Sequence, residues 1–137
     1  MRNLFLRIGS LMGFLAVVLG AFAAHGLRPY LEPRSFETFE TAVRYQFYHA
    51  LAILLVAVLS HFGRKGALRL AAWAFTVGIL LFSGSLYALS TRELHQISVG
   101  WLGPITPLGG LCYLLGWGAL FYSSFFHYDR TGKNAEA

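Results

Sequence analysis

Charged side chains are scarce in this chain of 137 residues. Asp, Glu, Lys and Arg together fill 12% of its positions, whereas 56% are hydrophobic. Ordinary soluble domains have about a quarter of their positions charged, so this chain lacks the charged surface that a water-soluble core requires. The shortage excludes an ordinary soluble protein and indicates an all-α integral membrane protein.

Four long segments carry no charged residue and define the expected topology. They are residues 8–27, 45–63, 70–91 and 94–128. About 20 apolar residues span a bilayer as a helix, so each of the first three segments fits one crossing. The fourth is too long for one helix, and we expect Thr106 to cap a spanning helix that starts at Pro107 and ends near Phe126, after an interfacial lead-in over 97–105. The sequence thus predicts a four-transmembrane-helix bundle in a single domain, 1–127, followed by a short polar cytoplasmic tail, 128–137.

Cysteine is nearly absent as well. Cys112 is the single one, which excludes an intrachain disulfide.

The first 24 residues have the basic start, apolar middle and small residues of a secretory signal peptide. Three further segments of spanning length follow, so cleavage there would still leave a membrane protein.

The positive charges are unevenly distributed between the predicted loops. With the N-terminus in the cytoplasm, seven of the eleven Lys and Arg residues lie inside and four lie outside, as the positive-inside rule favours. We therefore expect both termini in the cytoplasm. The net charge of +5 then reflects topology and contact with lipid headgroups. It does not indicate nucleic acid, because no basic stripe with interleaved aromatic residues is present.

Small residues recur every three or four positions in the first predicted helix. The stripe consists of Gly9, Gly13, Ala16, Gly20 and Ala24. Such a stripe lets another helix approach closely. We expect it to serve helix packing, with a homo-oligomer contact as a special case.

An amphipathic helix is predicted from about Ser35 into the second spanning segment. One face carries Phe36, Phe39, Val43 and Phe47, and the adjacent face carries Glu37, Glu40, Thr41, Arg44 and Tyr48. We expect Ser35 to cap this helix. We also expect the segment to lie along the outer membrane interface before it turns inward.

The predicted topology brings several separated polar residues to the outer surface. One interpretation is a polar pocket between the first, second and fourth spanning helices that binds a lipid headgroup, a small anion or a protein partner. Its candidate residues are His25, Glu40, Arg44, Tyr45, Tyr48, His49, Thr106, Gly109 and Gly110. The alternative is an interfacial belt in which tyrosines anchor the helix and Arg44 pairs with Glu40 or Glu37.

Other chemistry has little support in the sequence. A zinc site from His25, His49 and His95 has suitable residue types but no ligand spacing. No hydrolase, metalloprotease or phosphate-loop motif is present, so we expect no enzyme, no cofactor and no bound metal. The central parts of the four helices lack ionisable groups, which argues against an ion-coupled exporter. A small-solute transporter or channel built by oligomerisation stays open as the alternative function.

Four stretches together resemble a known family. They are "GAFAAHGL" at 20–27, "FETAVRYQFYHALA" at 39–52, "GILLFSGSLYAL" at 78–89 and "ITPLGGLCYLLGW" at 105–117. In order and spacing they are similar to the YgdD/YwdK family of small bacterial membrane proteins, a family without an established activity. Ala23 departs from the pattern, which usually has a second glycine there.

The resemblance implies a four-helix protein of a bacterial cell membrane and implies no reaction. The family's signature residues fall on His25, Arg44, Tyr45, Gln46, Tyr48, His49, Ser83, Ser85, Thr106, Pro107, Gly109 and Gly110. Most of the candidate pocket residues are among them, although shared motifs equally encode packing.

Overall fold

The computed structural model describes residues 2–60, 64–95, 97–128 and 134–136. Its long elements are α1 (Arg2–Phe22) continued by the π-helical turn η1 (Ala23–Leu27), α2 (Pro33–Leu59), α3 (Lys65–Gly78) continued by the π-helical turn η2 (Ile79–Ser83) and α4 (Gly84–Ser90), and α6 (Ile105–Ser123). The short elements are α5 (Arg92–His95), the 3₁₀-helix η3 (Gly100–Leu102), β1 (Phe126–Tyr128) and β2 (Asn134–Glu136).

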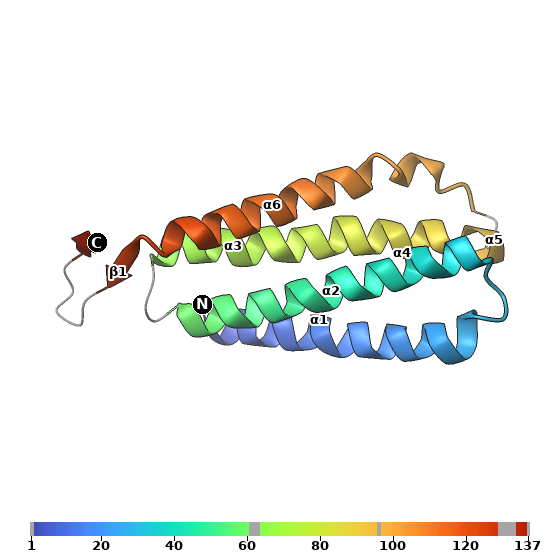
Figure 1. Cartoon of the computed structure of the whole chain (residues 1–137), viewed down its shortest axis with the longest axis horizontal. Coiled ribbons are helices and arrows are strands. Elements are labelled where there is room, and N and C mark those ends of the chain that lie inside the picture. The colour runs from blue at the N-terminus through green and yellow to red at the C-terminus, as the bar shows by residue number, and fades with distance from the viewer. Residues whose placement is uncertain (1, 61–63, 96, 129–133, 137) are drawn as a thin grey trace.

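The described residues form four helical rods that run side by side (Figure 1). All four are long and apolar enough to cross a membrane, over Arg2–Leu27, Pro33–Leu59, Lys65–Ser90 and Gly100–Ser123. Both chain termini lie at one end of the bundle, here called the terminal end, and α5 lies at the opposite end, called the α5 end. The predicted fold class, an all-α four-helix transmembrane bundle, is confirmed.

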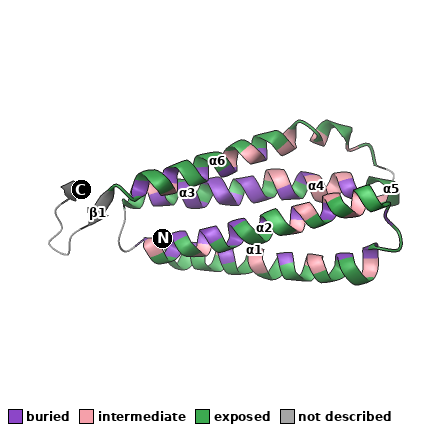
Figure 2. Cartoon of the chain, viewed as in Figure 1, coloured by how far each residue is buried: buried purple, intermediate pink, exposed green. Residues whose placement is uncertain are grey.

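The rods pack mainly as two neighbouring pairs. α1 packs along α2 and α3 packs along α6, while α2 also contacts α3 and α4. α1 and α6 make no extensive contact with each other in the described part of the chain. This arrangement leaves α1 and α6 on the outside of the bundle, where Figure 2 shows exposed positions along their length. Large apolar side chains such as Phe14, Leu114 and Phe121 are exposed there, as suits helices that face lipid.

Two helices start earlier than the sequence predicts. α2 begins at Pro33 with Glu32 at the N-cap, and no side chain caps it, so Ser35 lies within the first turns. Proline is favoured at the first helical position because its missing N–H is not needed there. α6 begins at Ile105, since Pro104 already has helical φ and ψ angles. The predicted capping role of Thr106 is therefore wrong.

The amphipathic segment is the first part of α2 and not a separate helix. No break divides it from the apolar part of the helix, because α2 is continuous over 27 residues. Its aromatic face packs as expected: Phe39 is buried in a cluster with Ala23, Leu27 and Leu31, and Phe36 and Val43 cover this cluster. The predicted apolar face is thus packed at Phe36, Phe39 and Val43, but Phe47 is exposed, and the predicted turn inward does not occur.

The small-residue stripe of α1 packs against α2 of the same chain. A side chain at Gly9 would collide with Leu54, one at Gly20 would press on Val43, and Ala16 is buried. The packing interpretation is confirmed for these three residues, whereas Ala24 is exposed and Ala23 is buried instead. A homo-oligomer contact through the same stripe stays a prediction.

The π-helical turns were not predicted. Each of η1 and η2 widens its helix by one residue, with i→i+5 in place of i→i+4 hydrogen bonds. After such a turn the side chains point about 100° away from the direction an uninterrupted α-helix would give them. A short antiparallel ladder between β1 and β2, in which Phe126 pairs with Glu136, was also not predicted.

Candidate functional site

Gln46 joins three helices in the interior of the bundle. Its Nε2 donates to the backbone oxygen of Met12 at 2.9 Å, and its Oε1 accepts from the Tyr87 hydroxyl at 2.9 Å. The side chain is 3% exposed, so both ends of the amide are bound where water does not reach. The Tyr87 ring also packs on Phe39, with 4.8 Å between ring centroids. This bridge fixes α1, α2 and α4 to one another.

His49 is a fully bonded histidine in the aromatic interior. Its Nδ1 donates to the backbone oxygen of Tyr45 at 2.8 Å, and its Nε2 accepts from the indole Nε1–H of Trp117 at 3.2 Å. A carbonyl can only accept and an indole N–H can only donate, so this geometry requires the neutral tautomer with its proton on Nδ1. Both ring nitrogens are occupied in this structure, so a ligand could reach either one only by breaking one of these bonds.

The polar groups at the start of α6 hold this helix against α4. Ser85 Oγ donates to the backbone oxygen of Phe82 at 2.9 Å and lies 2.6 Å from Thr106 Oγ1, which therefore donates to it. Gly109 is required by close approach, because a Cβ there would collide with the backbone nitrogen of Phe82. Gly110 is different, since a Cβ there would have no neighbour within 4 Å. Thr106 is thus a packing residue between α6 and α4, and Gly109 is one between α6 and η2.

Two interior hydroxyls have no hydrogen-bond partner among the described residues. They belong to Ser83 and Tyr113, and both are buried. The two residues are neighbours, but their hydroxyl groups do not meet in hydrogen-bonding geometry. Among the described residues they are the buried side-chain polar groups that lack a hydrogen bond.

A small pocket lies between α1, η1 and α2 toward the α5 end. It has a volume of about 200 Å³ and is lined by Gly20, Ala23, Glu40, Val43 and Arg44. The Arg44 guanidinium donates to the backbone oxygen of Glu40 and to the Thr41 hydroxyl, each at 3.4 Å. Within the described residues it is not paired with the carboxylate of Glu40 or Glu37, contrary to the ion pair that the helix spacing favours. Both charged side chains of this pocket are exposed.

The structure does not bring the nine predicted pocket residues together. Glu40 and Arg44 line the pocket just described, whereas Tyr45 and His49 contact the aromatic interior, at 4.8 Å from Phe82 and 3.5 Å from Tyr113 between ring centroids. His25 and Tyr48 are exposed. The physical reason is the lack of extensive contact between α1 and α6 in the described residues, so that neither of the described pockets is lined by the first, second and fourth spanning helices together.

His25, His49 and His95 do not lie together as a metal site. Among the described residues no group of three or more His, Cys, Asp or Glu side chains is close enough to hold a metal ion. His25 is exposed and His49 is bonded in the interior. His95 accepts from the Ile97 backbone N–H through Nδ1 at 3.1 Å, and its Nε2 lies 3.3 Å from the Ala88 oxygen.

Sequence reasoning missed the aromatic partners that complete the interior. Trp117, Tyr113 and Tyr87 come from distant helices, and nothing in their local pattern indicates which residue each one meets. Gln46 offered a signal, because an amide in the middle of an apolar helix requires a partner. It was noted as a family signature residue but not as a candidate site residue.

These features define an integral membrane protein of four spanning helices with a bonded polar interior. The chain belongs to the family described as "Protein of unknown function (DUF423)", whose model matches residues 19–110. It is 45% identical to a UPF0382 membrane protein of Haemophilus influenzae over 125 residues, which cover 91% of this chain and 96% of that protein.

A second relative confirms the resemblance seen in the sequence. The UPF0382 membrane protein YwdK of Bacillus subtilis is 43% identical over 116 residues, which cover 84% of this chain and 90% of YwdK. No solved structure matches the chain. The family and the membrane location are thereby shown, and the names of these relatives give no enzymatic activity.

Proposed function

We propose that this protein is a non-enzymatic lipid-binding protein of the bacterial cell inner membrane. Its ligand is the headgroup of a phospholipid that carries both a phosphate and a primary ammonium group. The binding site is the pocket lined by Glu40 and Arg44 between α1, η1 and α2. The observation that carries the proposal is the presence of two opposite charges, one helical turn apart, on the wall of one small pocket.

The depth of the pocket supports a headgroup as ligand. α2 has 27 residues, which corresponds to a length of about 40 Å, compared with a hydrocarbon thickness of about 30 Å. The charge-free part of α2 starts at Tyr45, so Arg44 marks the boundary of the hydrocarbon. Glu40 lies one turn farther out. Phosphate and ammonium groups of phospholipids lie in this interfacial layer.

The chemistry of the walls fits the two charges of such a headgroup. A guanidinium binds phosphate oxygens through several N–H donors at once, and a carboxylate accepts hydrogen bonds from a primary ammonium. Gly20 and Ala23 leave the opposite wall smooth. A volume of about 200 Å³ is smaller than the roughly 300–1,000 Å³ of sites for drug-sized ligands, which favours a small polar group.

The interior favours binding at the bundle ends over passage of a solute through the bundle. The buried amide of Gln46 and imidazole of His49 bond to other groups of the bundle. A polar path for a solute would have to break these bonds. For this reason we do not propose passage of a solute through the interior of one bundle, and a transporter or channel built between subunits by oligomerisation stays the alternative prediction.

We also propose that both termini are cytoplasmic. The charges support this orientation, because α1 and α3 both begin at the terminal end, and their first turns with the preceding Arg64 carry Arg2, Arg7, Arg64, Lys65 and Arg69. Cations next to spanning helices are retained on the cytoplasmic side. The pocket lined by Glu40 and Arg44 then faces the periplasmic leaflet.

Lipid retention in native mass spectrometry tests the proposed site. The protein is equilibrated in mild detergent with equal amounts of dioleoyl phosphatidylethanolamine and dioleoyl phosphatidylcholine, which differ only in the ammonium group. We expect retention of the ethanolamine lipid, a loss of roughly tenfold in Arg44→Gln and a loss of the preference in Glu40→Gln, since hydrogen bonds to charged groups contribute about 1.5–3 kcal/mol.

Arg34→Gln is the matched control. Arg34 is exposed on the same helix and does not line the pocket, so retention should stay at the wild-type level. Equal retention of the two lipids by the wild-type protein would refute the ammonium contact. Retention that is unchanged in Arg44→Gln, together with loss of a co-purifying protein, would mean that this surface binds a protein partner.

A further inference from the structure

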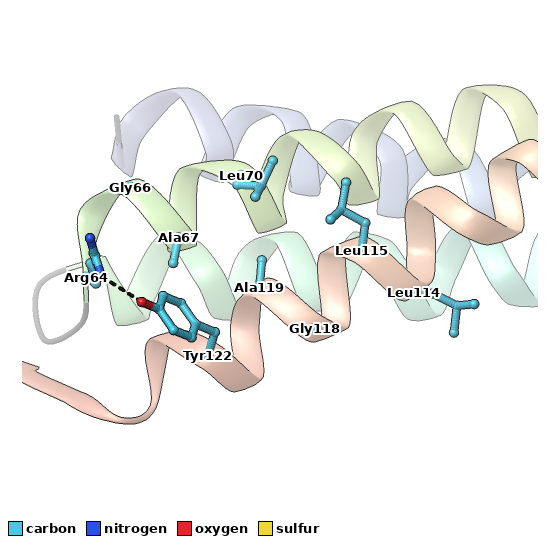
Figure 3. Close-up of a pocket in the computed structure, with 9 residues that line it drawn as sticks. All are labelled: Arg64, Gly66, Ala67, Leu70, Leu114, Leu115, Gly118, Ala119 and Tyr122. Atoms are coloured by element: carbon cyan, nitrogen blue, oxygen red, sulfur yellow. Dashed lines mark hydrogen bonds between the residues drawn. The ribbon is translucent and has the colours of Figure 1, made fainter. Parts of the chain in front are cut away.

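A larger groove lies between α3 and α6 at the terminal end of the bundle. Figure 3 shows it running from Arg64 and Tyr122 at its mouth to Leu114 and Leu115 at its inner end. Its volume is about 640 Å³. No residue of the groove is among the site residues predicted from the sequence, and it lies at the opposite end of the bundle from the pocket lined by Glu40 and Arg44.

The groove exists because small residues leave space between α3 and α6. Gly66 and Ala67 of α3 face Gly118 and Ala119 of α6 along its walls. A Cβ at Gly66 or at Gly118 would have no neighbour within 4 Å, so the space above both glycines is open. An apolar, open and elongated groove on the outside of a membrane protein fits one hydrocarbon chain.

The mouth of the groove carries positive charge. Arg64 donates from Nη1 to the Tyr122 hydroxyl at 2.9 Å, and its guanidinium carbon lies 5.6 Å from the centre of the Tyr122 ring. This contact holds the guanidinium across the mouth. Lys65 and Arg69 follow on the first turns of α3, whose N-terminus adds a partial positive charge. The described part of α3 therefore presents cations and no acidic residue at this end.

We infer that this groove binds an anionic phospholipid, with one acyl chain between α3 and α6 and the phosphate at Arg64. The guanidinium has a planar set of N–H donors that matches phosphate geometry. The apolar walls and the cationic mouth match the two parts of such a lipid in the order in which they lie in a leaflet. The inference is independent of the proposed headgroup site, because the two sites share no residue.

A second copy of the chain is a poorer occupant of the groove. Two copies in one membrane have the same orientation, so their basic ends lie at the same depth. A helix of the second copy in this groove would bring its own Arg64, Lys65 and Arg69 close to those of the first. Like charges at short distance disfavour that contact, whereas an anionic headgroup neutralises them.

Competition between two lipids with identical chains tests the charge at the mouth. The protein is equilibrated with equal amounts of dioleoyl phosphatidylglycerol and dioleoyl phosphatidylcholine and examined by native mass spectrometry. We expect preferential retention of phosphatidylglycerol and a loss of roughly tenfold in Arg64→Gln. Arg7→Gln removes the same charge from an exposed residue of α1 that does not line the groove and should retain most of the lipid. Equal losses in both variants would overturn the site, because diffuse attraction would then explain the binding.

Filling the groove tests the position of the acyl chain. Gly118→Leu places a side chain in the open space of the groove, and Gly110→Leu places the same side chain on α6 at another open position. We expect loss of bound phosphatidylglycerol in the first variant only. Gly66→Leu fills the groove from α3 and replaces Gly118→Leu if that variant does not fold. Unchanged lipid retention in the filled groove overturns the inference. If the number of subunits changes at the same time, the groove is a contact between copies of the chain.

The experiments can refute each of the two lipid sites independently of the other. Loss of the phosphatidylethanolamine preference in Glu40→Gln reports only on the pocket at the α5 end. Loss of phosphatidylglycerol in Arg64→Gln reports only on the groove. Each variant is therefore measured against both lipid pairs.

Discussion

The imidazole of His49 lies parallel to the phenol ring of Tyr113, with 3.5 Å between ring centroids and 7° between ring planes. The stacked pair joins α2 to α6 although the backbones of these helices make no extensive contact. Trp117, one turn farther along α6, donates to the same imidazole. Side chains from α6 thus reach across α3 to α2, and His49 is the residue that both of them meet.

The bond between Trp117 and His49 gives the first prediction. His49→Phe preserves an aromatic ring and removes the acceptor, and Trp117→Phe removes the donor. We expect each variant to lower the free energy of unfolding by about 0.6–2 kcal/mol, the range for hydrogen bonds between membrane helices. The double variant should lose less than the sum, since the bond can be lost only once. Unfolding in mixed micelles of sodium dodecyl sulfate measures the four proteins, and strictly additive losses would contradict the bond.

Gly109 and Gly110 should respond oppositely to alanine. A methyl group at Gly109 would collide with the backbone of Phe82, whereas one at Gly110 has open space. We expect Gly109→Ala to destabilise the protein by about 1–3 kcal/mol through overpacking. Gly110→Ala should be neutral or raise stability by up to about 1 kcal/mol, because alanine favours the helix. The two melting temperatures in one detergent decide the question, and equal values would show that close approach at Gly109 is not required.

The unpartnered hydroxyls should be dispensable for stability. Ser83 and Tyr113 bury oxygen atoms that have no partner in the described structure. Ser83→Ala and Tyr113→Phe should therefore leave the unfolding free energy within about 0.5 kcal/mol of the wild type or raise it, since no bond is lost. Ser85→Ala is the control, because Ser85 bonds to Thr106 and Phe82. It should lose about 1 kcal/mol. Losses of that size in Ser83→Ala and Tyr113→Phe would show that their hydroxyls are bonded in the membrane.

Labelling of single cysteines tests the orientation. In a Cys112→Ala background, His25→Cys and Arg69→Cys place exposed thiols at opposite ends of the bundle. A membrane-impermeant maleimide added to spheroplasts should label position 25 and leave position 69 unlabelled until the cells are opened. The reverse pattern would place both termini outside and would contradict the charge distribution.

Much of the fold could be predicted because hydrocarbon imposes a simple rule. A charged residue in the bilayer centre is costly, so the absence of charge marked three spanning segments directly, and Thr106 and Pro107 placed the fourth within a longer charge-free stretch. The ends were less predictable. α2 begins at Pro33, and Pro104 precedes α6 with helical φ and ψ angles. The sequence pattern instead favoured Ser35 and Thr106, which are more common capping residues.

The candidate site was only partly predictable. Glu40 and Arg44 share a pocket wall because both lie on one helix, where spacing determines which residues are neighbours. His49 and Thr106 were grouped with them by depth alone. Which helices contact each other depends on packing across the whole bundle, and His49 is turned toward α6 while Glu40 and Arg44 are turned toward α1.

The π-helical turn η2 determines the direction in which the side chains of α4 point, because it adds one residue to the helix. Removing any one residue from Ile79–Ser83 would restore a regular helix and turn everything beyond it by about 100°. Ser85 would then leave Thr106 and Tyr87 would leave Gln46, although no partner had been mutated. A deletion of one residue in this region would therefore break the contacts of this helix with α2 and with α6 at the same time.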